Sequence, residues 1–232
     1  MPSAINVEDF LTHGLETMGL HIDNLPEVTG RLSLYFHELK KWNRKINLVA
    51  RTLADQQILE NHFLDSLTLV ALFDREDIKA ETVLDVGTGA GFPGLVLKTA
   101  FPLLKVVLIE PRRNRYYFLK HIVRILDLKE VEVLNIRLTE GVAVEELTNR
   151  RFSIITSRAF TDISRFVRLT EPYLADDGRI VCMKGPGAEG ELSSLKKERL
   201  SKIFYVSGSR RLRLPYSKAA RTLVSIRRAG TD

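Results

Sequence analysis

A glycine-rich turn constrains the fold of this chain most. The apolar run Thr82–Val86 is followed within eight positions by Gly87, Gly89, Gly91 and Gly94, and then by an amphipathic stretch through Ala100. Glycines at such a turn let the backbone bend sharply and approach a ligand with no Cβ in the way. The order of strand, glycine turn and helix predicts a ligand-binding β–α unit.

Short β-type runs and stretches of helical length alternate after this turn. The later runs are 105–110, 131–136, 152–156 and 179–183, and we expect helices over 113–126 and after 131–136. This alternation predicts a mostly parallel sheet covered on both faces. The last two runs, 203–206 and 222–226, have no convincing helix between them and should pair as an antiparallel hairpin. The fold class predicted is α/β and Rossmann-like, with a hairpin ending that is typical of methyltransferases.

The first third of the chain has the apolar spacing of helices. Apolar residues recur at helical intervals over 7–15 and 32–42, and a third helical stretch covers 53–73. We therefore expect a helical N-terminal extension over residues 1–78 and a cofactor-binding domain over residues 79–232.

The glycine turn fits two cofactors. Asp85, Gly87, Gly89 and Gly91 match the turn that holds S-adenosylmethionine, whereas Gly89, Gly91 and Gly94 match the dinucleotide fingerprint. Glu110, at the end of the second run, can accept hydrogen bonds from the ribose hydroxyls of either ligand. The acid before the first glycine and the predicted hairpin favour the methyl donor. A nicotinamide-dependent oxidoreductase remains the alternative.

Few other chemistries are open to this chain. Its five histidines have no metal-ligand spacing, and we expect no metal. The single cysteine, Cys182, lies in a predicted central strand, where a buried inert thiol is expected. This argues against methylation of pyrimidine carbon 5, which needs a thiolate. Methylation of guanine N7, in contrast, needs no general base, because the lone pair of that nitrogen is free.

The charge of the chain favours a polyanionic partner. The formal net charge is +6, and the segment 200–229 contains no acid. Basic residues cluster after predicted strand ends, where an open parallel sheet binds its ligand; they are Arg112, Arg113, Arg115, Arg137, Arg158 and Lys184. A non-catalytic RNA-binding or assembly factor is the second alternative. With no signal peptide and no membrane-length apolar run, we expect a soluble, cytoplasmic protein, and nothing indicates an obligate dimer.

Several motifs together resemble the RsmG family, also called GidB. The matching segments are 42–48 (Trp-Asn-Arg-Lys-Ile-Asn-Leu), 62–67 (His-Phe-Leu-Asp-Ser-Leu), 85–94, 157–160, 184–185, 213–215 and 221–224. The resemblance implies a methyltransferase that forms 7-methylguanosine in bacterial small-subunit ribosomal RNA. Of these segments, 42–48 and 62–67 can also serve to dock the N-terminal extension, which we expect for Trp42.

The resemblance also implies roles for individual residues. It places Gly87 and Phe92 along the cofactor, Leu138 and Thr139 around the adenine, and Arg158 toward the cofactor or the guanine as the catalytic candidate. Its basic positions Arg115, Arg137 and Lys184 are expected to bind RNA, together with Arg213 and Arg221 of the C-terminal segment.

Overall fold

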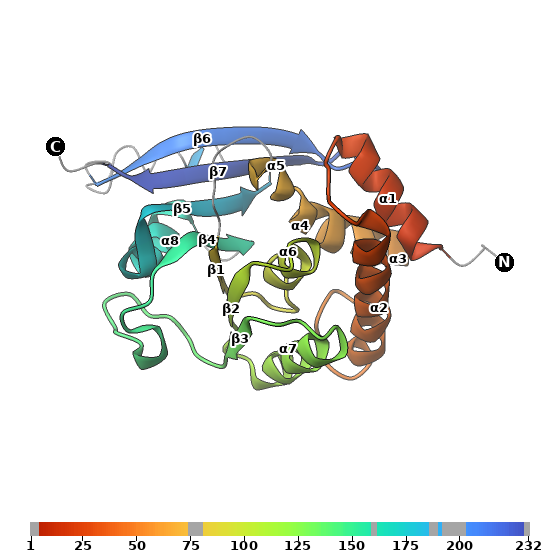
Figure 1. The fold of residues 1–232 in the computed structure, drawn as a ribbon, viewed down its shortest axis with the longest axis horizontal. Helices are drawn as coiled ribbons and strands as arrows, with labels where there is room; N and C mark the ends of the chain where they lie inside the picture. The colour runs from red at the N-terminus through yellow and green to blue at the C-terminus, as the bar shows by residue number, and fades with distance from the viewer. Residues whose placement is uncertain (1–4, 74–80, 159–161, 186–189, 192–202, 230–232) are drawn as a thin grey trace.

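The computed structural model describes residues 5–73, 81–158, 162–185, 190–191 and 203–229, which build one sheet with helices on both faces (Figure 1). The seven strands of these residues run in the order β3-β2-β1-β4-β5-β7-β6. Their bounds are β1 Thr82–Val86, β2 Lys105–Ile109, β3 Val131–Leu134, β4 Phe152–Arg158, β5 Leu174–Lys184, β6 Phe204–Arg213 and β7 Ala220–Arg228.

The strand directions confirm the predicted fold class. Strands β1 to β5 are parallel, whereas β7 is antiparallel to both β5 and β6. The carboxyl ends of the five parallel strands therefore share one edge of the sheet, which we call the carboxyl edge. The glycine turn after β1, Glu110 after β2 and Arg158 at the end of β4 all meet there, as Rossmann-like folds require of a ligand site.

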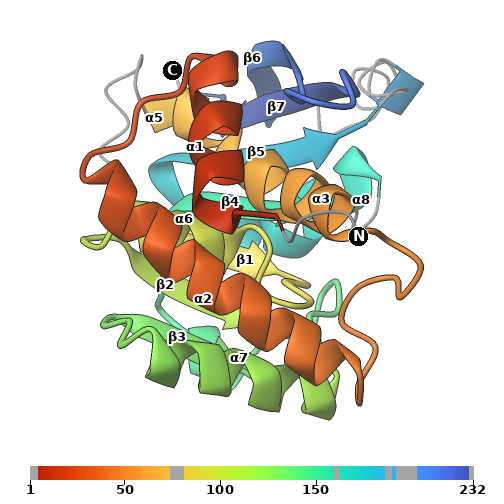
Figure 2. The same ribbon diagram turned by 90° about the vertical axis from the view of Figure 1, so that its right-hand side faces the viewer.

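Each face of the sheet supports its own apolar core, because successive strand residues point to opposite faces. Val83 and Val106 join the core under α1 (Val7–Met18), α2 (Leu25–Asn43), α6 (Gly94–Ala100) and α7 (Arg113–Ile125) (Figures 1 and 2). Leu84 and Val107 join the second core, which α8 (Ile163–Thr170) covers together with the 3₁₀ turns Glu145–Leu147 and Glu171–Tyr173. No described helix is long and apolar enough to cross a bilayer.

The N-terminal helices lie on the same face as α6 and α7 and share their core (Figure 2). Trp42 packs edge-on against Phe118 of α7 with ring centres 5.6 Å apart, so its predicted docking role is confirmed. The boundary expected at residue 78 lies outside the described residues, and the division into two domains remains a proposal.

Two helical expectations differ from the structure. The stretch expected over 53–73 is divided into α3 (Asp55–Ile58), a π-helix (Leu59–Leu64), α4 (Asp65–Leu67) and α5 (Val70–Phe73). The helix expected after β3 is absent, and that segment runs without regular structure to the turn Glu145–Leu147. Gly141 adopts φ +76° within it, which breaks helical geometry. The segment instead lines the site described next.

Candidate functional site

Asp85 supports the glycine turn from beneath. Its side chain is fully buried, and its Oδ2 accepts from the Gly94 amide at 2.8 Å and from the Thr88 hydroxyl at 2.6 Å. Burial raises the pKa of Asp85 to about 6, while these two hydrogen bonds act to lower it. Asp85 thus ties both ends of the turn together.

Glu110 joins the glycine turn to the start of α7. Its Oε2 accepts from the Gly89 amide at 3.0 Å, and its Oε1 accepts from the Arg112 amide at 2.8 Å. The carboxylate is buried at the carboxyl edge, as expected for a ribose acceptor. Each carboxylate oxygen retains a second lone pair, so Glu110 can still receive ribose hydroxyls while holding the turn.

Gly91 lies where the turn meets the N-terminal helices. Its φ is +95°, and a Cβ there would collide with the hydroxyl of Tyr35, which donates to the carbonyl of Ala90. Tyr35 was not identified from the sequence, because it belongs to the ordinary apolar stripe of α2. The structure makes it a support for the turn, and Gly91 is required by packing and backbone geometry together.

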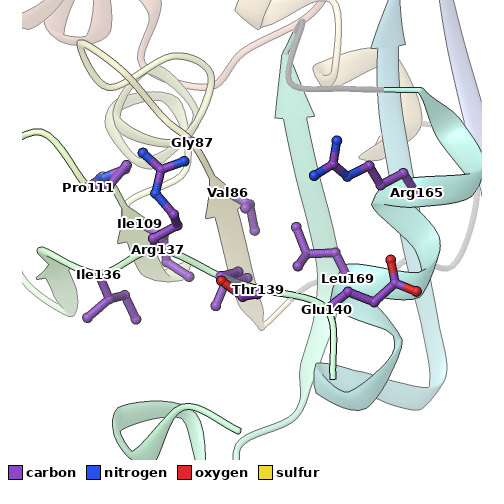
Figure 3. A pocket seen from close by; sticks show the side chains of 11 residues that line it. Val86, Gly87, Ile109, Pro111, Ile136, Arg137, Thr139, Glu140, Arg165 and Leu169 are labelled. Atoms are coloured by element: carbon purple, nitrogen blue, oxygen red, sulfur yellow. The ribbon is translucent and has the colours of Figure 1, made fainter. Parts of the chain in front are cut away.

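A cavity of about 400 Å³ opens beside Gly87 at the ends of β1, β2 and β3 (Figure 3). Gly87 adopts φ +70°, and with no Cβ its backbone is open to a ligand. The cavity also brings together Leu138 and Thr139, the expected adenine neighbours, and the exposed Arg137. Its remaining lining residues, which sequence reasoning missed, are Val86, Ile109, Pro111, Ile136, Glu140, Arg165 and Leu169.

The cavity fits an adenosine-containing cofactor. Its volume is within the range of small-molecule sites. Val86, Ile109 and Leu138 give it apolar lining suited to a flat base, and Thr139 adds a polar group. Arg165 lies across from Val86 (Figure 3). Arg165 and Leu169 come from α8, which is remote in sequence from the glycine turn and gave no motif signal.

Phe92 lies away from this cavity. It is buried, stacks on Tyr35 with ring centres 5.7 Å apart and stacks on His62 at 5.1 Å. The cavity lining does not include it. The structure therefore places Phe92 between the glycine turn and the N-terminal helices, where it carries the guanidinium of Arg158 over its ring at 5.3 Å.

Arg158 is held by the π-helix. Its Nη1 donates to the carbonyl of Asn61 at 2.5 Å, and its Nη2 donates to Nδ1 of His62 at 2.6 Å. Asp65 lies 3.6 Å from Nη1. A π-helix is rare and often marks a functional site, because the extra residue in the turn frees backbone groups. This arrangement, which we call the Arg158 clamp, fixes the guanidinium at the carboxyl edge.

The protonation of His62 follows from the clamp. An arginine can only donate, so Nδ1 accepts and the proton of the neutral ring lies on Nε2. Burial, reinforced by the charge of Arg158, lowers the pKa of His62 to about 3. Within the described residues the buried Nε2 has no hydrogen-bond partner.

Asp65 links the clamp to the C-terminal hairpin. Its Oδ1 accepts from Nε of Arg221 at 2.9 Å. Burial raises the pKa of Asp65, and the charges of Arg221 and Arg158 oppose this rise. The sequence left His62 and Asp65 undecided between docking and function, and the structure gives both residues direct contacts to candidate site residues.

The other basic candidates are distributed along the carboxyl edge and the hairpin. Arg115 reaches within 4.0 Å of Glu110, and Lys184 pairs with Glu191 at 2.7 Å. Arg213 donates to the carbonyl of Lys218 at 3.2 Å in the hairpin turn, apart from the cavity. The structure thus brings Arg158 and Arg221 together around one carboxylate, and places Arg115 beside the glycine turn.

Comparison with known proteins gives a consistent family assignment. Residues 29–215 match the family model GidB, described as rRNA small subunit methyltransferase G. The chain is 40% identical over 217 residues to the ribosomal RNA small subunit methyltransferase G of Desulfotalea psychrophila, covering 94% of this chain and 96% of that protein. It is 38% identical over 216 residues to the protein of the same name from Geobacter sulfurreducens, covering 93% and 95%.

Solved structures share the fold at low sequence identity. A putative O-methyltransferase from Klebsiella pneumoniae superposes with a TM-score of 0.54 at 12% identity, covering 85% of this chain and 90% of that chain. The ribosomal protein L11 methylase of Lactobacillus delbrueckii subsp. bulgaricus gives 0.53 at 14% identity, covering 73% and 79%. These likenesses support the methyltransferase architecture.

Proposed function

Because the chain belongs to the rRNA small subunit methyltransferase G family, we propose that it transfers the methyl group of S-adenosylmethionine to N7 of a guanine in small-subunit ribosomal RNA. The family excludes the oxidoreductase interpretation of the glycine turn, since its members are methyltransferases. Two findings support S-adenosylmethionine as the methyl donor: the family itself, and a cavity whose lining suits an adenosine.

One observation supports this function most: the glycine turn beside the cavity and the Arg158 clamp lie at the carboxyl ends of neighbouring strands. Strands β1 and β4 are neighbours, with Asp85 paired to Thr156. Gly87, just past the end of β1, and Arg158, at the end of β4, each follow this pair by two residues and are therefore level with one another. A donor held against Gly87 and a base held against Arg158 would meet at the strand ends.

The donor site follows from the lining. We assign the backbone of the glycine turn, from Gly87 to Gly91, to the amino-acid part of the donor, Glu110 to the ribose, and Leu138 with Thr139 to the adenine. When bound, S-adenosylmethionine supplies a methyl group on a sulfonium, which the N7 lone pair attacks in line as the carbon–sulfur bond breaks. The residues contribute alignment and exclusion of water.

Arg158 is assigned to the guanine. A guanidinium has five N–H donors, and the clamp occupies one on each of Nη1 and Nη2. The remaining donors can bind guanine O6, an acceptor beside N7, and so leave the N7 lone pair free for the methyl group. No proton leaves N7 during its methylation, so no general base is required near Arg158.

The RNA is assigned to the basic groups around this edge. Arg137 and Lys184 lie at or just past the ends of β3 and β5, and Arg115 lies in the first turn of α7, which follows β2. Phosphates flanking the target would pass these groups. Arg213 and Arg221 extend this assignment onto the hairpin. Such contacts carry affinity more than base specificity, and the guanine itself is read by Arg158 in this account.

Transfer of a labelled methyl group tests the proposal. Purified protein is incubated with radiolabelled S-adenosylmethionine and small ribosomal subunits from a strain that lacks this enzyme, and the digested RNA is separated into nucleosides. Label in 7-methylguanosine supports the proposal. Label in another nucleoside overturns the assignment of N7, and absence of label while S-adenosylhomocysteine still binds favours the assembly-factor alternative.

A further inference from the structure

The loop between α2 and α3 carries basic side chains that the fold itself does not use. Residues 44–54 include Arg44, Lys45 and Arg51 and contain no acid. All three side chains are exposed, and among the described residues none of them forms an ion pair. Arg51 makes one long contact, 3.5 Å from the carbonyl of Arg44.

The neighbouring lysines have structural partners that these three lack. Lys40 pairs with Asp55, and Lys41 pairs with Glu38 at 3.3 Å. Both lysines lie in the last turn of α2, where a cation complements the helix dipole. The basic residues beyond the helix end therefore need another explanation.

The loop has a fixed shape. Oδ1 of Asn43 accepts from the amides of Leu48 at 2.8 Å and Val49 at 3.1 Å, and both apolar side chains are buried. At its other end, the side chain of Gln57 accepts from the amide of Ala54 at 2.9 Å. The cations are presented on a preorganised backbone, which lowers the entropy cost of binding.

The loop lies beside the donor site. Nη2 of Arg115 donates to the carbonyl of Asn47 at 3.1 Å, and the same guanidinium reaches toward Glu110. Figure 2 shows the loop after α2 on the side of the molecule toward which β5 points, which is the carboxyl edge. Arg115 is thus a bridge from the loop to the glycine turn.

The start of α7 continues the positive surface. Arg112 is its N-cap residue and Arg113 follows, and the first turn contains no acid. Basic groups at a helix N-terminus oppose the helix dipole. Both side chains are exposed, so the fold does not compensate them by burial against an acid.

A groove accompanies these charges. A hollow of about 420 Å³ is lined by Arg44 and Arg51 and by apolar residues that include Val49, Leu53 and Ile58. A hollow lined by both cations and apolar side chains suits a phosphate together with its sugar. A single-stranded or looped RNA offers both groups at each nucleotide.

We propose that the loop 44–51, together with the start of α7, binds the sugar-phosphate backbone of the RNA beside the target guanine. The inference rests on the proposed function and adds Arg44, Lys45 and Arg51 to the RNA-contacting residues. They position the strand so that the guanine reaches the Arg158 clamp from the side of the N-terminal helices.

The test compares two triple variants of the full chain. The first replaces Arg44, Lys45 and Arg51 with glutamine. The control replaces Lys105, Lys129 and Arg151 with glutamine and so removes the same charge. These three cations are exposed and lie near the opposite ends of the strands. Filter binding measures the Kd for unmethylated small ribosomal subunits over a range of salt concentrations, and thermal unfolding checks that both variants fold.

We expect the first variant to bind about 10-fold more weakly near 0.15 M salt, and its slope of log K against log salt to fall by about 2, since each single-strand phosphate contact contributes about 0.7. The control should retain a slope near that of the wild type. Equal slopes in the two variants would overturn the proposal. If the triple variant unfolds, Lys45→Gln and Arg51→Gln are measured singly, each with an expected loss of about 0.7 in slope.

The two proposals fail separately in this design. Binding is measured without methyl transfer. If the wild type transfers no methyl group, the proposed function is wrong, and the binding surface is still judged from the slope of log K against log salt. If the wild type forms 7-methylguanosine and the triple variant binds as the wild type does, only the proposed binding surface is wrong.

Discussion

Nη2 of Arg158 donates to Nδ1 of His62 at 2.6 Å across 96 residues of sequence. This contact connects the end of a central strand to the π-helix of the N-terminal extension, and Phe92 lies beneath both side chains. Through this contact the N-terminal extension becomes part of the candidate site, because the hydrogen bond to His62 fixes the direction of the Arg158 guanidinium.

His62→Phe tests this contact, since phenylalanine can keep the stacking on Phe92 but accepts no hydrogen bond. We expect kcat for methyl transfer to fall about 10- to 100-fold, the value of a hydrogen bond to a charged group. The Kd for S-adenosylhomocysteine should stay nearly unchanged. His62→Asn places an amide oxygen near the position of Nδ1 and should restore much of kcat. Equal loss in both variants, or a loss of cofactor binding, would count against a positioning role.

The buried histidine also predicts how stability depends on pH. The pKa of His62 is about 3 in the folded chain, against an ordinary value of 6.5. Between these values the unfolded chain binds one more proton than the folded chain, so this residue removes stability as the pH falls below 6.5. Relative to His62→Asn, the wild type should lose about 1.4 kcal/mol more for each pH unit through this window. Urea unfolding at several pH values measures the free energy of unfolding of both proteins. Parallel plots of this free energy against pH would contradict the prediction.

Asp65→Ala should destabilise the fold strongly. Its side chain is buried between Arg158 and Arg221, so its removal leaves two guanidinium groups without their carboxylate. Loss of one partner in a buried ion pair costs about 3–5 kcal/mol. Asp55→Ala is the matched control, because Asp55 pairs with Lys40 at the surface, where such a pair contributes about 0–1 kcal/mol. Chemical unfolding measures the free energy of unfolding of both variants. Similar losses in the two would show that the buried ion pair is unimportant for stability.

Cys182 should be inert in the folded protein. It is buried in β5, and burial raises the pKa of its thiol to about 12. A thiol reagent should react with it only after unfolding, and Cys182→Ala should keep its methyl-transfer activity to within about 3-fold, because only a thiolate can act as a nucleophile. Loss of activity in a folded Cys182→Ala variant would indicate a covalent mechanism, and the assignment of a guanine nitrogen would then be wrong.

The sequence predicted the central part of the fold because its signals there are local. Alternating strands and helices, the glycine turn from Gly87 to Gly94 and the acid at Glu110 each depend on neighbouring residues. Cys182 was also placed correctly, inside an apolar run. The strand ends were less well predicted: β5 begins at Leu174, before the expected start at Arg179.

The remaining parts of the site depend on contacts between distant segments. Nothing in the apolar spacing of α2 showed that Tyr35 would lie under Gly91. A π-helix has no separate sequence signature, so the clamp formed by Asn61, His62 and Asp65 could not be predicted. The segment after β3 was expected to be helical. The family resemblance placed its residues Leu138 and Thr139 beside the adenine, whereas its irregular path and the lining residues Ile136 and Glu140 emerged only from the tertiary structure.

A crystal structure with S-adenosylhomocysteine bound tests the central claim most directly. The account predicts the ligand in the cavity beside Gly87, with its adenine between Leu138 and Thr139 and its ribose hydroxyls within hydrogen-bonding distance of Glu110. Its sulfur should point toward the strand end that carries Arg158. A ligand bound elsewhere, or one whose sulfur points away from Arg158, would contradict the assignment of this cavity to the methyl donor.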